Sequence, residues 1–263
     1  MRLQKQGGDN LPWLEAWEEI SAHPDRLLAR SLLDDAAART LRRIGEAETV
    51  GWSWSAGKDS LGLAAVLEHA GLLDLPGMGR WTALEFPEFL DWSRENAPES
   101  VTVEVDEEIN LQWLVGRPTL LFPERNVSRW FEFVQKRAQR QFARARGMDL
   151  LIGGWRRADG NYLGQAGREF EYVSPQGFTK FSPIAQWSHE ELLHVLAYSG
   201  TTMPPIYDYP RGFVLGTGPW PSRQRHPLGL LASWQEIDQV APQLVLDAAS
   251  AEIPSARTFL ESR

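Results

Sequence analysis

The chain has 263 residues, of which 43% are hydrophobic and 24% are charged, and its formal net charge is −8 at pH 7. This length suits one large α/β domain, and an acidic chain is not expected to coat nucleic acid, although it can carry a local basic groove. The sequence contains no cysteine, which excludes disulfides, iron–sulfur clusters, thiolate zinc sites and cysteine nucleophiles. No apolar run reaches the ~20 residues of a membrane span, and the N-terminus lacks the apolar core of a signal peptide, so we expect a cytoplasmic protein.

Hydrophobic residues at a spacing of three to four predict helices over residues 11–46, with Trp13 and Trp17 attaching the first of them to the domain. Short β-rich or apolar runs predict strands at residues 49–54, 81–86, 101–105 and 149–153. Further helices are expected from the turn after the first strand to about Gly71, and over residues 127–147. Strands that alternate with helices predict a doubly wound, mainly parallel sheet with helices on both faces.

The second half of the chain is less regular. Residues 154–182 are rich in glycine and charge and are expected to form a long functional loop. Ser188 and Glu191 form a capping-box pattern that predicts a helix to about Tyr198. We expect residues 204–229 to be irregular and the tail to be helical. The predicted organisation is a helical N-terminal extension (1–46), a nucleotide-binding α/β domain (47–228) and a helical tail packed on it (229–263).

The turn after the first strand has the composition of a phosphate-binding loop. Its residues are Ser55, Ala56, Gly57, Lys58, Asp59 and Ser60. Ligands of open parallel sheets bind beyond the carboxyl ends of strands, and the start of the next helix favours an anion. Gly57 would allow close approach of the backbone, Lys58 would add positive charge, and Asp59 would cap the helix or hold Mg²⁺. The spacing differs from that of the Walker loop, and a serine-capped helix after a glycine turn is the alternative interpretation.

At this point the sequence resembles a known family. The SxGKDS turn is similar to the PP-loop of ATP pyrophosphatases, in the branch of phosphoadenosine phosphosulfate (PAPS) reductases and the small subunit of sulfate adenylyltransferase. Other similar stretches follow in the same order, over roughly residues 45–225. They are LIGGWRR (151–157) with Asp159 near the family's acidic position, FSPIAQW (181–187) with PIY (205–207), and LGTGPWP (215–221).

The resemblance implies an adenine nucleotide alpha hydrolase-like fold and attack on the α-phosphate of ATP, with Mg²⁺ as cofactor. The turn at residues 55–60 would then bind the pyrophosphate end, with Gly153 and Gly154 as further nucleotide-binding residues. Arg156 and Arg157 would face the same crevice and bind the α-phosphate or an oxyanion; a solvated loop is the alternative. Glu85 would take part in adenosine contacts, although the segment around it departs from the family pattern.

Both cysteines of the family's terminal motif are replaced here, by Thr217 and Trp220. Because only a thiolate is ionised and soft near neutral pH, reduction of an activated sulfate is excluded. What remains is adenylyl transfer from ATP to an oxyanion or nucleobase acceptor, without an iron–sulfur cluster or zinc. Two alternatives stay open: a sulfur-transfer or nucleic-acid-modifying enzyme that uses a partner's persulfide, and a non-catalytic nucleotide-binding subunit of a complex.

Other charged residues have two interpretations each. Lys136, Arg140 and Arg144 share one helix face, which is either solvated or binds a nucleic acid. Cations of the terminal loop either close over substrate phosphate or are simply exposed; they are Arg211, Arg223 and Arg225. His189 and His194 are expected to be surface or helix-packing residues.

Overall fold

The computed structural model describes residue 3 and residues 10–124, 127–160 and 171–263. The strands are β1 (Val50–Ser53), β2 (Gly77–Thr82), β3 (Val101–Asp106), β4 (Leu150–Ile152), β5 (Glu171–Val173) and β6 (Thr179–Phe181). The helices up to β4 are α1 (Leu11–Ala22), α2 (Arg26–Ile44), α3 (Lys58–His69), α4 (Pro87–Glu95), α5 (Leu111–Val115), η1 (Pro118–Leu120), α6 (Val127–Phe131), η2 (Glu132–Lys136) and α7 (Arg137–Arg146). Those after β4 are η3 (Arg157–Asp159), α8 (His189–Tyr198), η4 (Pro205–Tyr207), α9 (Gly212–Leu215), α10 (Trp220–Arg223), α11 (Leu230–Val240), α12 (Pro242–Ser250) and α13 (Pro254–Glu261).

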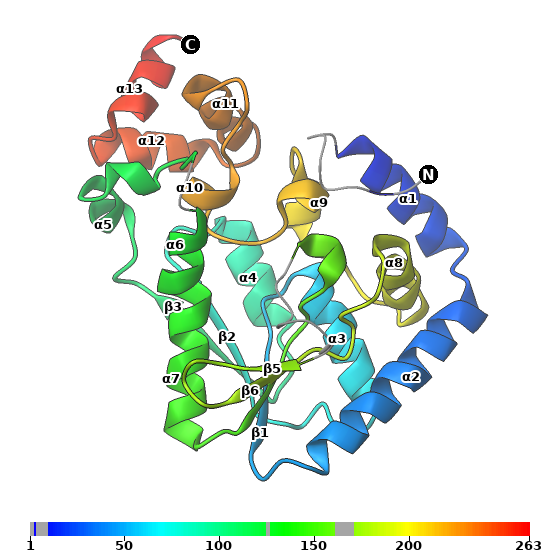
Figure 1. The fold of residues 1–263 in the computed structure, drawn as a ribbon. Coiled ribbons are helices and arrows are strands. Elements are labelled where there is room, and N and C mark those ends of the chain that lie inside the picture. Colours follow the sequence, from blue (N-terminus) through cyan, green and yellow to red (C-terminus); the bar gives the residue numbers. More distant parts are fainter. Residues whose placement is uncertain (1–2, 4–9, 125–126, 161–170) are drawn as a thin grey trace.

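One six-stranded sheet organises these elements, in the order β3-β2-β1-β4-β6-β5. All neighbouring strands pair in parallel except β5 and β6, and Trp52 of β1 lies opposite Gly77 of β2 and Ile152 of β4. Figure 1 shows α2, α3 and α8 on one side of the sheet and the long helix built from α6, η2 and α7 on the other. The predicted doubly wound, mainly parallel fold is therefore confirmed.

The strand predicted at residues 81–86 is wrong in its position. β2 spans Gly77–Thr82, so Glu85 and Phe86 follow the strand. Glycine disfavours strands, yet a Cβ at Gly77 would lie 2.7 Å from Trp52 Nε1, and a Cβ at Gly79 would lie 2.5 Å from the Trp81 ring. Glycine is used at both positions because the tryptophan rings occupy the space that a side chain would need.

The long loop predicted at residues 154–182 is also wrong in part, because it contains β5 and β6; residues 161–170 lie outside the described part. The predictions for the neighbouring helices hold better. The helix from 127 is continuous but contains the π-helical turn η2, and it ends at Gly147 with a left-handed φ of 59°. Both hydrogen bonds of the Ser188–Glu191 capping box are present at the start of α8.

The terminal helices share one hydrophobic core with the sheet domain. Trp13 of α1 is buried, stacks on Phe213 at a centroid distance of 5.5 Å and meets His189 edge-on. At the other end, Trp234 of α11 packs against Trp220 and Phe122. The division into three parts stays a prediction.

Within the described residues, the helices are too short or too polar to cross a bilayer.

Candidate functional site

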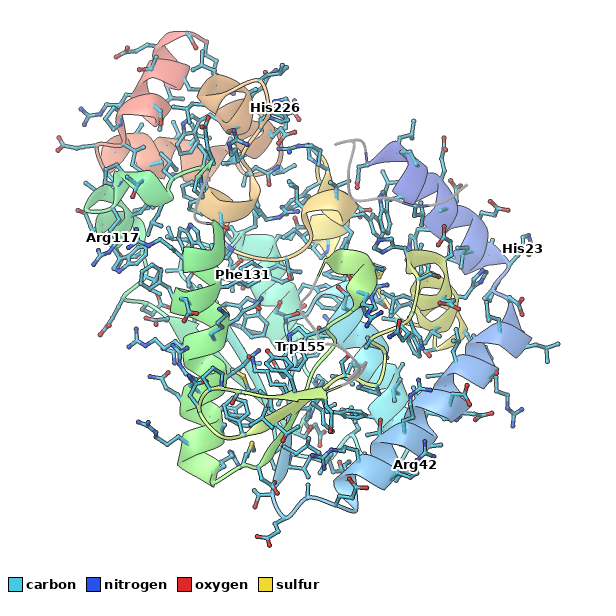
Figure 2. All side chains as sticks on the ribbon, in the orientation of Figure 1. His23, Arg42, Arg117, Phe131, Trp155 and His226 are labelled. Carbon is cyan, nitrogen blue, oxygen red and sulfur yellow. The ribbon has the colours of Figure 1, made fainter. Side chains whose placement is uncertain are left out.

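A crevice of about 250 Å³ opens at the carboxyl ends of β1 and β4. In the strand order, β1 is followed along the chain by its neighbour β2 on one side, and β4 leads to its neighbour β6 on the other, so the order reverses between β1 and β4; this is the switch point where doubly wound proteins bind ligands. The turn after β1 and the exit of β4 form one wall, the α6–α7 helix with Phe131 forms another, and residues 215–219 of the terminal loop close a third. Figure 2 shows Phe131 and Trp155, two lining residues, near the middle of the molecule.

The turn after β1 is held in an unusual backbone conformation. Ala56 adopts a left-handed φ of 55°, which an L residue with a side chain seldom does. A Cβ on Gly57 would lie 3.1 Å from Thr217 Oγ1, so this glycine also admits the terminal loop. Ser60 Oγ donates to the Gly57 carbonyl at 2.9 Å, and Ser55 Oγ donates to Ser60 Oγ at 3.3 Å. The turn and helix start are thus fixed by short-range hydrogen bonds.

Tyr207 of η4 caps the first helical amide. The Lys58 N–H donates to the Tyr207 hydroxyl oxygen at 2.6 Å, and Gly57 provides no side-chain cap. Burial, and then the negative charge of Asp59, raise the pKa of the Tyr207 hydroxyl. This hydroxyl therefore stays neutral and contributes a dipole, not a charge, at the start of α3.

Lys58, Asp59, Arg156 and Asp159 form a group that we call the charge cluster. Lys58 Nζ lies 2.9 Å from both carboxylate oxygens of Asp59 and 3.1 Å from Asp159 Oδ1. Arg156 Nε donates to Asp59 Oδ1 at 2.7 Å, and Arg156 Nη2 pairs with Asp159 Oδ2 at 2.7 Å. Two cations and two carboxylates sum to zero formal charge, which offsets the cost of burying a lysine with 1% of its side chain exposed.

The expectation for the arginine pair needs correction. The Arg156 side chain is wholly buried and also donates to the carbonyls of Trp187 and Ser188, at 3.0 and 2.8 Å. Its guanidinium holds the two carboxylates in place from behind and does not face the crevice. Arg157 is exposed and is not among the residues that line the crevice. Asp59 likewise meets cations and does not cap its own helix.

The exit of β4 packs directly on the start of α3. A Cβ on Gly154 would lie 2.5 Å from the Asp59 carbonyl oxygen, so the two segments touch backbone to backbone. The Gly153 N–H donates to the Phe181 carbonyl at 2.9 Å. The structure thus brings Gly153 and Gly154 together with the turn, as the sequence predicts, while their role in binding stays a prediction.

Glu85 lies on the far wall, after β2. Its side chain lines the crevice and is 2% exposed, and burial raises the pKa of the carboxyl to about 8 against the lowering effect of the Arg223 charge. Sequence reasoning placed Glu85 correctly at the crevice but gave no role to Tyr207. It named Asp159 without assigning it a site role; the signal was its spacing of three residues from Arg156.

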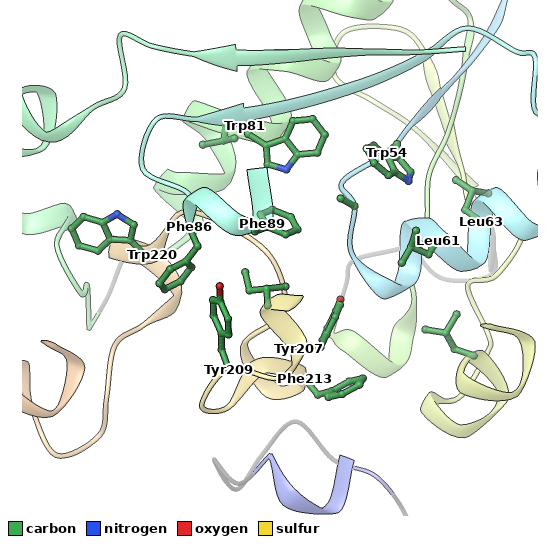
Figure 3. Packing of buried hydrophobic residues seen from close by; sticks show 14 of the residues in the cluster. Trp54, Leu61, Leu63, Trp81, Phe86, Phe89, Tyr207, Tyr209, Phe213 and Trp220 are labelled. Atoms are coloured by element: carbon green, nitrogen blue, oxygen red, sulfur yellow. The ribbon is translucent and has the colours of Figure 1, made fainter. Parts of the chain in front are cut away.

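The two positions of the replaced cysteines have different surroundings. Thr217 lines the crevice beside Gly57, whereas Trp220 is fully buried and packs against Phe122 and Trp234. Figure 3 shows Trp220 beside Phe86, away from the turn after β1. Only Thr217 is therefore placed to meet a ligand.

The remaining charged residues are mostly paired. Glu132 binds Lys136 at 2.7 Å and Arg140 at 3.1 Å on the exposed face of the long helix. Arg211 pairs with Glu236, and Arg225 pairs with Glu124, so neither closes over the crevice. The imidazole of His194 accepts from the Asp25 N–H. In the described ranges, no three histidine or acidic side chains gather as a metal site.

No protein-family model and no curated protein sequence matches the chain. Solved structures with a similar chain path include the PAPS reductase from Candida auris in a phosphate complex, with a TM-score of 0.49 and 15% identity over 69% of this chain and 88% of that chain. Another is the FMN adenylyltransferase from Candida glabrata in complex with FAD and inorganic pyrophosphate, with a TM-score of 0.49 and 12% identity over 69% of this chain and 60% of that chain.

A third is the U34-tRNA thiolase from Methanococcus maripaludis with its [4Fe-4S] cluster, with a TM-score of 0.39 and 12% identity over 81% of this chain and 71% of that chain. At such identities the similarities assign no activity, substrate or partner to this chain.

Proposed function

We propose that the protein binds ATP in the crevice and transfers the adenylyl group to an acceptor, with release of pyrophosphate. The observation that carries this proposal is the position of the turn at residues 55–60. It joins the carboxyl end of β1 to α3 at the switch point and lines the same crevice as the exit of β4. A helix start with Lys58 at its first position favours an anion there.

The chain's own residues would act mainly by position and charge. The turn would bind the pyrophosphate end of ATP, with Lys58 next to its oxygens and Asp59 and Asp159 holding the Lys58 ammonium in position. Arg156 would hold both carboxylates through its fork of donors. An acceptor oxygen would form a bond to the α-phosphorus while the bond to the bridging oxygen breaks, so the electron pair leaves with pyrophosphate. This displacement needs no thiol.

The charge cluster supplies two carboxylates for Mg²⁺, whose four oxygens all pair with Lys58 or Arg156 in this structure, so the ion would replace some of these pairs. The ion is commonly held by one or two carboxylates together with substrate phosphates. Asp59, whose side chain is 27% exposed, and Asp159, at 4%, would hold it beside the turn. When bound, Mg²⁺ would neutralise charge on the phosphate oxygens.

Exchange of radiolabelled pyrophosphate into ATP tests the proposal, with sulfate, carboxylates and nucleosides supplied as acceptors. Lys58→Ala is expected to lower exchange by about 100-fold or more, as loss of a charged donor at the reacting group does in other enzymes. Lys136→Ala is the matched control, because Lys136 is exposed and pairs at the surface with Glu132, away from the crevice. Unchanged exchange in Lys58→Ala would refute the site, and tight ATP binding without exchange would favour a non-catalytic nucleotide-binding subunit.

A further inference from the structure

Two arginines, the half-buried Arg211 and the buried Arg156, use the same edge of the guanidinium to bind carboxylates, and the buried Arg223 does not. Arg211 donates from Nε to Glu236 Oε1 at 2.8 Å and from Nη2 to Glu236 Oε2. Arg156 presents Nε to Asp59 and Nη2 to Asp159, both at 2.7 Å. This edge matches the spacing of two carboxylate oxygens, which explains its recurrent use.

Arg223 is the exception. Its Nη1 donates to Gln224 Oε1 at 3.1 Å, but its Nε and Nη2 are buried and have no hydrogen-bond partner among the described residues. The residue is 6% exposed, and its guanidinium lies 5.6 Å from the centre of the Phe86 ring. Burial lowers the pKa of Arg223 to about 10, so the group is still charged at neutral pH. A buried cation with two unbonded donors is costly, and an anion on that edge would remove the cost.

Glu85 offers a second buried polar atom beside it. Its Oε2 has no hydrogen-bond partner among the described residues, and no ion pair joins Glu85 to Arg223. With a pKa near 8, the carboxyl is mostly protonated at pH 7. A neutral carboxyl can donate a hydrogen bond to an anion without repelling it.

The backbone brings these two residues to the same wall. The Trp220 N–H donates to the Leu84 carbonyl at 2.9 Å, which joins the segment before Glu85 to the helix that ends at Arg223. In Figure 3, Trp220 and Phe86 lie next to each other on these segments. Glu85 and Ser222, the neighbour of Arg223, both line the crevice. Arg223 itself does not line the crevice but lies directly behind this wall: burial lowers its pKa, while Tyr207 and Glu85, which both line the crevice, are close enough to raise it.

We infer that Arg223 and Glu85 form an oxyanion subsite at the far wall of the crevice, where Glu85 lines the space and Arg223 lies behind it, and that this subsite binds a carboxylate, phosphate or sulfate group of the acceptor. We call it the Glu85–Arg223 subsite. That the bound anion belongs to the acceptor rests on the proposed function. Anion binding itself requires no turnover.

Titration of the full chain with sodium sulfate, phosphate and acetate tests the subsite, by calorimetry and thermal unfolding at constant ionic strength. We expect saturable binding of at least one anion, and the preferred shape, planar or tetrahedral, identifies the acceptor group. Arg223→Lys is expected to lower the affinity by roughly 10- to 100-fold, because the two-pronged fork is lost. Arg225→Gln is the matched control, since Arg225 lies in the same loop but pairs with Glu124 at the surface.

The pH dependence gives a second, independent readout. In the unsubstituted protein, affinity is expected to fall by up to about tenfold per pH unit above pH 8, as Glu85 ionises. Glu85→Gln should remove this dependence, because the amide donates at every pH. This arm decides the matter even if Arg223→Lys fails to fold by circular dichroism.

Three results would overturn the inference: no saturable binding (buried water would then satisfy these atoms), equal affinity in Arg223→Lys, or loss of binding in Lys58→Ala alone. The last would place the anion at the turn after β1. Anion binding that persists in Lys58→Ala while pyrophosphate exchange is absent from every variant would support the subsite and refute the proposed function, so the two failures are distinguishable.

Discussion

Buried charged groups are paired on one side of the crevice and unpaired on the other. In the charge cluster, two cations meet two carboxylates at 2.7 to 3.1 Å. In the Glu85–Arg223 subsite, a buried carboxyl and a buried guanidinium form no ion pair, and both keep unbonded atoms. The first arrangement fixes the geometry of its side chains through hydrogen bonds and ion pairs. The second leaves both of its side chains open to pH and to a ligand, so burial alone does not tell whether a charged group is structural.

The sharpest way to break this comparison is to remove one arginine from each wall. Arg156→Met is expected to lower the free energy of unfolding by about 3 to 5 kcal/mol, because it removes one of the two cations that pair with Asp59 and Asp159 among the described residues. Arg223→Met is expected to change it by about 1 kcal/mol or less, since no ion pair is lost and a buried charge is removed. Urea unfolding at pH 7 measures both. Equal losses would show that the two walls do not differ.

The pH dependence of stability separates the walls next. The Glu85 carboxyl has a pKa of about 8 in the folded chain and an ordinary value of 4.5. Between these values the folded state keeps a proton that the unfolded state releases, so stability falls as pH rises from about 4.5 to 8 and is then level. The fall is at most about 5 kcal/mol. Glu85→Gln should become more stable relative to the unsubstituted chain over this range in urea titrations; a constant difference would contradict the assignment.

A smaller effect than that of Arg156 is expected at Tyr207, which joins the turn after β1 to η4. Tyr207→Phe would leave the Lys58 N–H without its partner at 2.6 Å and is expected to cost about 1 to 2 kcal/mol of unfolding free energy. Tyr198→Phe is the control, because the Tyr198 ring faces Arg26 and its hydroxyl has no hydrogen bond to a described residue. Similar stability of both variants in chemical denaturation would argue against a capping role for Tyr207.

The sequence predicts those parts of the fold whose signals are local. β1, β3, β4 and the capped helix α8 lie where apolar runs and the Ser188–Glu191 box place them. The turn at residues 55–60 is likewise a local motif at the end of a strand. The prediction for β2 starts too late in the chain, because two of the first three residues of the strand are glycines. These glycines make room for the rings of Trp52 and Trp81, a contact that no local sequence pattern reveals.

The site is less predictable, because its contacts join distant residues. Arg156 reaches Asp59 across 97 positions, and this pairing turns an expected ligand contact into a buried support. Arg223 is buried because it contacts Phe86 and because a hydrogen bond joins Trp220 to Leu84. Both contacts are between residues far apart in the sequence, so the sequence does not reveal this burial. A motif can therefore indicate which segments meet, but not which face of each side chain is used.

Helix α11 has a consequence for how the crevice can be adjusted. Glu236 accepts hydrogen bonds from Arg211 and, at 3.0 Å, from Gln224, and Trp234 packs on Trp220, so one helix braces the terminal loop at both ends. Substitutions on α11 that never contact a ligand can thus widen or narrow the opening. For protein engineering, this helix is a remote adjustment point, whereas exchanging it as an independent module would remove the support behind the third wall.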